Sequence, residues 1–177
     1  MFRLSAVVGG QIVKRLATAF LFAALLVAGV STSPLSASTS AGGASVSVDK
    51  RFKAKKNIGI KAGRSAYGKM LFAKNGQAIY IFEKERSKRS KCYGGCAQGW
   101  PPVLTKGRKK GRPKALGAVK QKLLGTTKRR GGARQVTYNG RPLYYYYDEL
   151  PGQVFCHNVF QYGANWAVIH PSGRIAD

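Results

Sequence analysis

The segment RQVTYNGRPLYYYYDE, residues 134–149, joins two strand-like patterns through an Asn-Gly pair. This pair predicts a two-residue type I′ hairpin turn at Asn139 and Gly140, because both central residues of that turn need a positive φ. A related segment, MLFAKNGQAIYIFEKE, occupies residues 70–85. The chain therefore repeats a strand–turn–strand unit, and we expect the same turn type in both copies.

A shift of 64 positions aligns the two copies over most of their length. It superposes residues of the same kind, namely Tyr80 with Tyr144, Phe82 with Tyr146, Glu85 with Glu149 and Cys92 with Cys156. Agreement at one offset indicates an internal duplication. No segment after residue 50 has a helical period. We therefore predict an all-β fold, with two tandem repeats of three to four antiparallel strands packed as one small β-sandwich or barrel-like domain.

The tyrosine run contributes side chains to both faces of its predicted strand, because neighbouring strand residues point to opposite sides. Tyr144 and Tyr146 share a face with Tyr80 and Phe82 of the other copy, and we expect this face in the core. The opposite face ends in Tyr147 where the first copy has Glu83, which suggests water or a ligand there. Tyr147, and Tyr145 on the same face, are the tyrosines expected to contact a ligand. The alternative is that they pack with their hydroxyls bonded at the rim.

The N-terminus has the order of a secretory signal peptide, with basic residues, then an apolar run at 16–30, then small residues. We predict a signal peptide with its helix at residues 1–37, a flexible basic linker at 38–56 and a duplicated β-repeat domain at 57–177. Within that domain we expect repeat one at 57–103, a basic loop at 104–120 and repeat two at 121–177. A retained N-terminal anchor is the alternative. The protein is expected to be secreted or periplasmic in a bacterial cell envelope, without a transmembrane span in its mature form.

The chain is strongly basic, with 31 Lys plus Arg against 6 Asp plus Glu. Such a charge attracts polyanions. The expected partners are an anionic envelope polymer or lipid surface, or extracellular nucleic acid, unless the charge only keeps the protein soluble. Basic clusters lie at 50–56, 84–91, 106–114 and 128–134. The candidate binding residues in these clusters are Lys106, Arg108, Lys109, Lys110, Arg112, Lys114, Arg129 and Arg130.

The strings CYGGCAQGWPPV and TYNGRPLYY, together with the signal peptide, resemble the bacterial secreted-repeat family of predicted lipoproteins with a Yx(FWY)xxD motif. The resemblance covers about residues 58–174 and implies export and the duplicated architecture. The residues that carry it are Tyr80, Phe82, Glu85, Trp100, Pro101, Pro102, Asn139, Gly140, Tyr144, Tyr146 and Glu149. Two features depart from the family pattern. Both copies have glutamate at the last motif position, and no cysteine for lipid attachment follows the apolar run.

Three cysteines leave an odd thiol in an exported chain. The glycines between Cys92 and Cys96 let a small ring close, and the family resemblance pairs these two as well. A bridge from Cys156 to either of them is the alternative. A zinc set of three cysteines with His157 has no standard spacing, so we predict no metal and no cofactor.

The sequence offers little for catalysis. Neither histidine lies in a nucleophile motif, and duplication alone accounts for the equivalent positions of Glu85 and Glu149. We therefore predict a non-enzymatic exported envelope protein, a binding module or structural component that associates with anionic polymers or surfaces through its basic loops. The alternative function is a periplasmic redox or metal-handling protein that uses Cys92, Cys96, Cys156 and His157.

Overall fold

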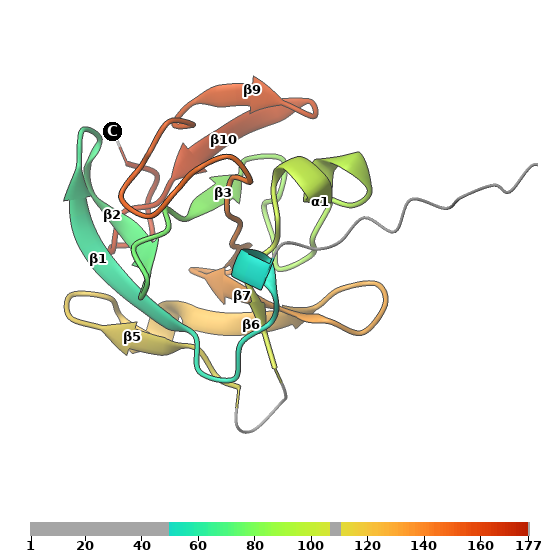
Figure 1. Cartoon of the computed structure of the whole chain (residues 1–177), viewed down its shortest axis with the longest axis horizontal. Helices are drawn as coiled ribbons and strands as arrows, with labels where there is room; N and C mark the ends of the chain where they lie inside the picture. The colour runs from blue at the N-terminus through green and yellow to red at the C-terminus, as the bar shows by residue number, and fades with distance from the viewer. Residues whose placement is uncertain (1–49, 107–110, 177) are drawn as a thin grey trace, which may run out of the picture. The chain divides into compact units, whose positions relative to one another are not determined.

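The computed structural model describes residues 50–106 and 111–176 (Figure 1). The predicted signal peptide and its helix, and most of the predicted linker, lie outside the described residues, as do Arg108, Lys109 and Lys110. The described parts of both repeats fall in a single compact unit. They are built mostly from strands, which confirms the predicted all-β class.

The described residues contain ten short strands, one α-helix and the two 3₁₀ helices η1 (Lys50–Phe52) and η2 (Gln121–Leu123). The elements of the first repeat are β1 (Gly59–Ser65), β2 (Gly68–Ala73), β3 (Tyr80–Phe82), α1 (Gly95–Gly99) and β4 (Leu104–Thr105). β5 (Lys114–Leu116) lies between the repeats. The elements of the second are β6 (Leu124–Lys128), β7 (Arg134–Tyr138), β8 (Arg141–Pro142), β9 (Val159–Gln161) and β10 (Ala164–Val168).

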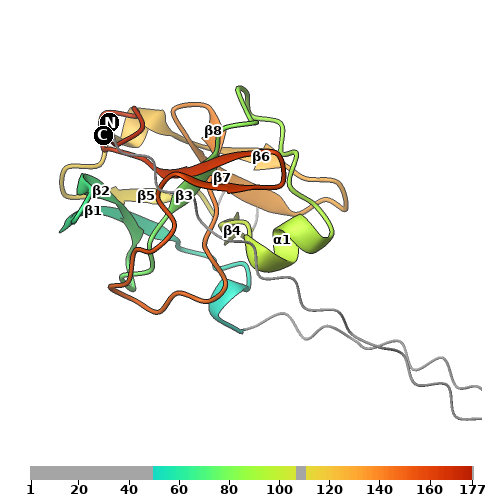
Figure 2. The same cartoon turned by 90° about the horizontal axis from the view of Figure 1, so that it is seen from above.

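The strands form three hydrogen-bonded sheets, ordered β2-β1-β5, β3-β10-β9 and β4-β7-β6, with β8 added to β7. The hairpins β1–β2 and β6–β7 are the equivalent opening units of the two repeats. All strand pairs are antiparallel except β1 with β5. Seen from above, the β1–β2 hairpin lies at the opposite side of the domain from α1 (Figure 2).

Each repeat gives its last strand to the other repeat. β4 of the first repeat pairs with β7 of the second. β10 of the second repeat pairs with β3 of the first (Figure 1). At the centre of this exchange, Tyr80 N donates to Tyr144 O and Tyr144 N donates to Tyr80 O, both at 2.9 Å. The two copies of the motif thus contact each other directly, and neither repeat completes its sheets alone.

The two Asn-Gly turns differ in type. Asn139 and Gly140 have φ values of 45° and 73°, and Tyr138 pairs with Arg141, which fits the predicted two-residue type I′ hairpin. In the first copy only Gly76 has a positive φ, 93°, so the prediction of a type I′ turn there was wrong. Ala73 N donates to Gln77 O at 2.9 Å and Gly76 N to Ala73 O at 2.8 Å, so the loop is one residue longer.

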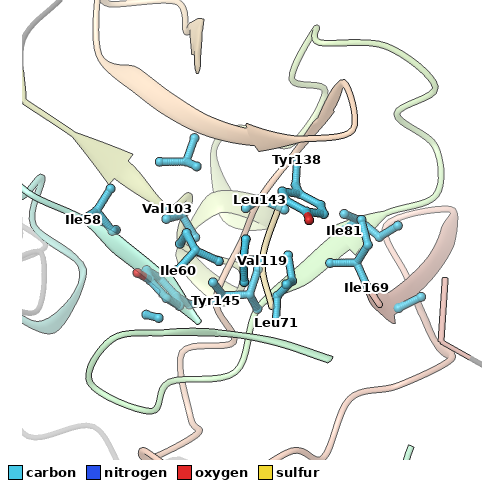
Figure 3. Close-up of a cluster of buried hydrophobic side chains, with 14 of the residues drawn as sticks. Ile58, Ile60, Leu71, Ile81, Val103, Val119, Tyr138, Leu143, Tyr145 and Ile169 are labelled. Carbon is cyan, nitrogen blue, oxygen red and sulfur yellow. The ribbon is translucent and has the colours of Figure 1, made fainter. Parts of the chain in front are cut away.

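The buried side chains form two apolar clusters. One contains Ile79, Ile81, Leu143 and Tyr145 (Figure 3), and the other contains the motif residues Tyr80, Phe82 and Tyr144. Neighbouring residues of each motif segment thus lie in different clusters, as the alternation of strand side chains predicted. The tyrosine run itself is not a continuous strand, because after β8 only Tyr144 forms bridges, to Tyr80 and Pro102. The five-residue helix α1 was not predicted, since it is too short to have a visible period.

Candidate functional site

A basic groove lies between the β6–β7 turn and the segment that precedes α1. It has a volume of about 840 Å³. Its lining comprises Arg89, Ser90, Lys91, Tyr93, Thr127, Lys128, Arg129, Arg130, Gly131 and Gly132. Five of these ten residues are cationic and none is acidic, so the groove has the charge expected of an anion-binding surface.

The β6–β7 turn places two arginines in this groove. Lys128 pairs with Arg134 at the end of the hairpin, and Arg129 N donates to Ala133 O at 2.8 Å. Gly131 and Gly132 have φ values of 79° and 86°, which side chains rarely adopt, so the chain reverses tightly here. The reversal leaves Arg130 exposed beside the groove.

Arg129 is part of the groove wall, with only 7% of its surface exposed. It donates to Gln135 Oε1 at 2.6 Å and to Cys92 O at 2.5 Å. Its guanidinium lies 4.3 Å from the centre of the Tyr93 ring, and that of Arg130 lies 4.0 Å from it. Both cations thus contact the same ring. Because Arg129 is buried and bonds to Gln135 and Cys92, it adds charge and order to the groove, whereas Arg130 is exposed to a partner.

The predicted Cys92–Cys96 disulfide is present, with a Cα–Cα distance of 5.2 Å. Cys96 lies in α1, and Tyr93 lies inside the ring that the bridge closes. The Cys92 carbonyl accepts the hydrogen bond from Arg129. The bridge therefore constrains two groups. One is the Tyr93 side chain, which both arginines contact, and the other is the Cys92 carbonyl, which accepts the hydrogen bond from Arg129.

The other predicted binding residues are dispersed. Tyr147 is exposed, at 48%, whereas Tyr145 is 5% exposed and belongs to the core. Arg112 lines a separate depression with Gln121 and Lys122. Lys106 and Lys114 are exposed, and neither lines the groove. Of the predicted residues that the structure describes, only Arg129 and Arg130 lie there.

The sequence did not single out the other four groove residues with a cationic or aromatic side chain, namely Arg89, Lys91, Tyr93 and Lys128. The clusters at 84–91 and 128–134 were the available signal, since each supplies part of the lining. Their proximity depends on the contact of Arg129 with Cys92, which joins residues 37 positions apart.

The motif tyrosines and glutamates bond across the repeats. Tyr80 donates its hydroxyl hydrogen to Glu149 Oε1 at 2.6 Å, and Tyr144 donates to Glu85 Oε1 at 2.7 Å. Both glutamates are fully buried. Burial raises the pKa of each carboxyl, against the opposing effect of the tyrosine and backbone hydrogen bonds. These residues join the two halves.

The aromatic motif residues also make reciprocal contacts between the two repeats. The Trp100 and Trp166 rings stack at 3.9 Å, Phe82 stacks on Trp166 at 4.3 Å, and Tyr146 lies against Trp100 at 4.9 Å. The third motif residue of each repeat thus packs on the tryptophan of the other. This explains why the motif needs an aromatic side chain at that position.

Cys156 and His157, which the alternative redox or metal-handling function would use, are held by contacts with neighbouring residues. Burial, followed by the neighbouring Glu149, raises the pKa of the free Cys156 thiol to about 12. His157 accepts a hydrogen bond from Val168 N at 3.3 Å and packs on Tyr67. Within the described ranges, no group of three or more His, Cys, Asp or Glu is arranged to hold a metal ion.

The comparison with protein families identifies both repeats. A family model described as a secreted repeat of unknown function matches residues 61–104 and 125–170. The chain belongs to this secreted-repeat family. The two matched segments contain β3, β7 and β10 and reach the first residue of β4, so the secreted repeat is the structural unit described above. No curated protein and no solved structure matched the chain. In the part of the chain that the structure describes, no helix has the length and apolar character needed to cross a membrane.

Proposed function

We propose that this secreted-repeat protein is a non-enzymatic binding module of the bacterial cell envelope, which holds anionic polymers in the groove at the β6–β7 turn. The observation that supports it best is the lining itself, which combines five cations with no carboxylate. The exchanged sheets are the scaffold. The basic residues outside the groove raise the local concentration of a polyanion.

The chemistry of the lining favours a polymer of phosphate or sulfate groups. Arg89 and Arg130 are exposed on the two sides of the groove, and a guanidinium binds such oxygens through two parallel hydrogen bonds. Lys91 and Lys128 add point charges nearby. Tyr93, held by the two arginines, gives the groove a fixed aromatic surface.

The proposal is tested by measuring heparin and teichoic-type polymer binding to the full mature chain across a salt series. Affinity should fall steeply as salt is added, because binding releases condensed counterions. The variant Arg130→Gln should weaken binding and reduce the slope against log salt concentration by about 1. The matched control is Arg64→Gln, since Arg64 is an exposed arginine on β1 that does not line the groove.

Two results would contradict the proposed function. The first is binding that does not change with salt, or no binding at low salt. The second is an equal effect of Arg130→Gln and Arg64→Gln, which would assign the attraction to net charge and not to the groove. An arm with double-stranded DNA and one with anionic vesicles distinguish an envelope polymer from the other polyanions.

A further inference from the structure

Another pocket, smaller than the basic groove, lies beside the core cluster of Figure 3, between the segment before β1 and the β2–β3 turn. Its volume is about 350 Å³. The buried residues Ile58 and Ala73 supply apolar wall, and the exposed residues Lys55, Asn57 and Lys74 lie at its opening. Gly59, Asn75 and Tyr145 complete the lining. None of these residues lines the basic groove.

The Tyr145 hydroxyl is the polar group of this pocket. The side chain is 5% exposed and its ring packs on Phe52 at 5.5 Å, and the hydroxyl makes no hydrogen bond to any described residue. Figure 3 shows the oxygen on the side of the ring that faces Ile58, at the edge of the cluster. The phenol is thus almost fully buried with its polar end at the pocket.

The other buried tyrosines have partners. The hydroxyls of Tyr80 and Tyr144 donate to the buried glutamates, and Tyr138 donates to Pro171 O at 2.7 Å. Tyr145 differs from them, because its oxygen has no partner among the described residues and is not among their buried atoms that lack one, so it remains accessible to solvent at the pocket.

The duplication shows that packing does not require this hydroxyl. The position equivalent to Tyr145 in the first repeat is Ile81, which is buried in the same cluster. An apolar side chain therefore fills that site in one copy. The second copy instead places a phenol hydroxyl at the edge of a pocket, where a ligand can accept its hydrogen bond in place of water.

We propose that this pocket binds a small organic anion, whose charged group accepts a hydrogen bond from Tyr145 between Lys55 and Lys74 and whose apolar body lies on Ile58 and Ala73. Burial raises the pKa of Tyr145, so the phenol keeps the proton that it donates. The volume lies at the lower end of the range for small-molecule sites. The inference does not depend on polymer binding, because different elements form the two sites.

The probe for the experiment is anilinonaphthalene sulfonate, which carries one anionic group on an apolar body. Fluorescence titration of the full mature chain should give one saturable site. Tyr145→Phe should weaken binding about tenfold, as expected for a hydrogen bond to a charged acceptor, and should leave the melting temperature equal or higher. N-phenylnaphthylamine lacks the sulfonate, so it should bind the wild type and Tyr145→Phe equally.

Charge controls separate the pocket from the rest of the basic surface. Lys74→Gln should weaken binding of the sulfonate, whereas Lys120→Gln should not, because Lys120 is an exposed lysine outside the pocket. Arg130→Gln should also leave probe binding unchanged, which keeps this test independent of the groove. The inference is overturned if Tyr145→Phe does not change probe affinity, if it lowers the melting temperature, or if no saturable binding occurs.

Discussion

At the scale of single residues, the four consecutive tyrosines have four different environments. Tyr144 bonds to Glu85 inside the molecule, Tyr145 packs in the core beside the small pocket, Tyr146 lies on Trp100, and Tyr147 is exposed. Alternation along the chain explains the first three. Tyr147 lies beyond the bridged residues, where its carbonyl accepts a hydrogen bond from Arg51 at 3.2 Å. The run is therefore mainly architectural.

The cross-repeat hydrogen bonds make Tyr144→Phe destabilising. This change removes the hydroxyl that donates to Glu85 and leaves a buried carboxyl with one partner fewer. We expect the free energy of unfolding to fall by about 1.5–3 kcal/mol, the range for hydrogen bonds to charged groups. Urea denaturation measures it. Tyr145→Phe is the matched control, and an equal loss in both variants would contradict the distinction between these tyrosines.

The same tyrosine gives a pH dependence with a definite sign. Burial, followed by the nearby Glu85, raises the pKa of Tyr144 above its ordinary value of 10.0. The native state then holds the proton more tightly than the unfolded chain. This contribution to stability is complete below pH 10 and is lost as the pH rises further. The stability of the wild type relative to Tyr144→Phe should therefore decrease above pH 10 in urea titrations, and a difference that grows there would contradict the assigned shift.

At the scale of elements, the disulfide links the short helix α1 to the groove. The double variant Cys92→Ser, Cys96→Ser should lose about 2 kcal/mol of stability in the chain-entropy model for so short a ring. We also expect weaker heparin binding at fixed salt, because Tyr93 and the Cys92 carbonyl lose the constraint that positions Arg129 and Arg130. Affinity that is unchanged in the folded variant would show that the bridge does not order the groove.

Local patterns predicted the elements better than the site. The strand patterns before the two Asn-Gly pairs and the turn at Asn139-Gly140 depend on neighbours in the chain, and the structure has them as β2, β7 and the β7–β8 turn. The longer loop at Asn75-Gly76 could not be recognised, because the same dipeptide closes both turns. The groove depends on contacts across tens of residues, and sequence alone gives only its charge.

At the scale of the whole molecule, the exchange of strands explains how a small domain tolerates its charge. The sheets β3-β10-β9 and β4-β7-β6 each contain strands of both repeats. The tryptophan stack and the two Tyr–Glu bonds lie between the same halves. Self-repulsion among the basic residues opposes compaction, and these apolar and hydrogen-bonded contacts between repeats oppose that repulsion.

The exchange predicts that neither repeat folds alone. A fragment of residues 50–106 would retain the β1–β2 hairpin but would leave β3 without β10, and residues 111–177 would leave β7 without β4. Isolated hairpins are only marginally stable. We expect each fragment to lack a cooperative thermal transition by circular dichroism, and an equimolar mixture to regain one. The control is the full chain cleaved at a protease site inserted within residues 107–110, which should stay assembled. Cooperative unfolding of either fragment by itself would mean that the repeats are independent units whose exchanged strands are dispensable.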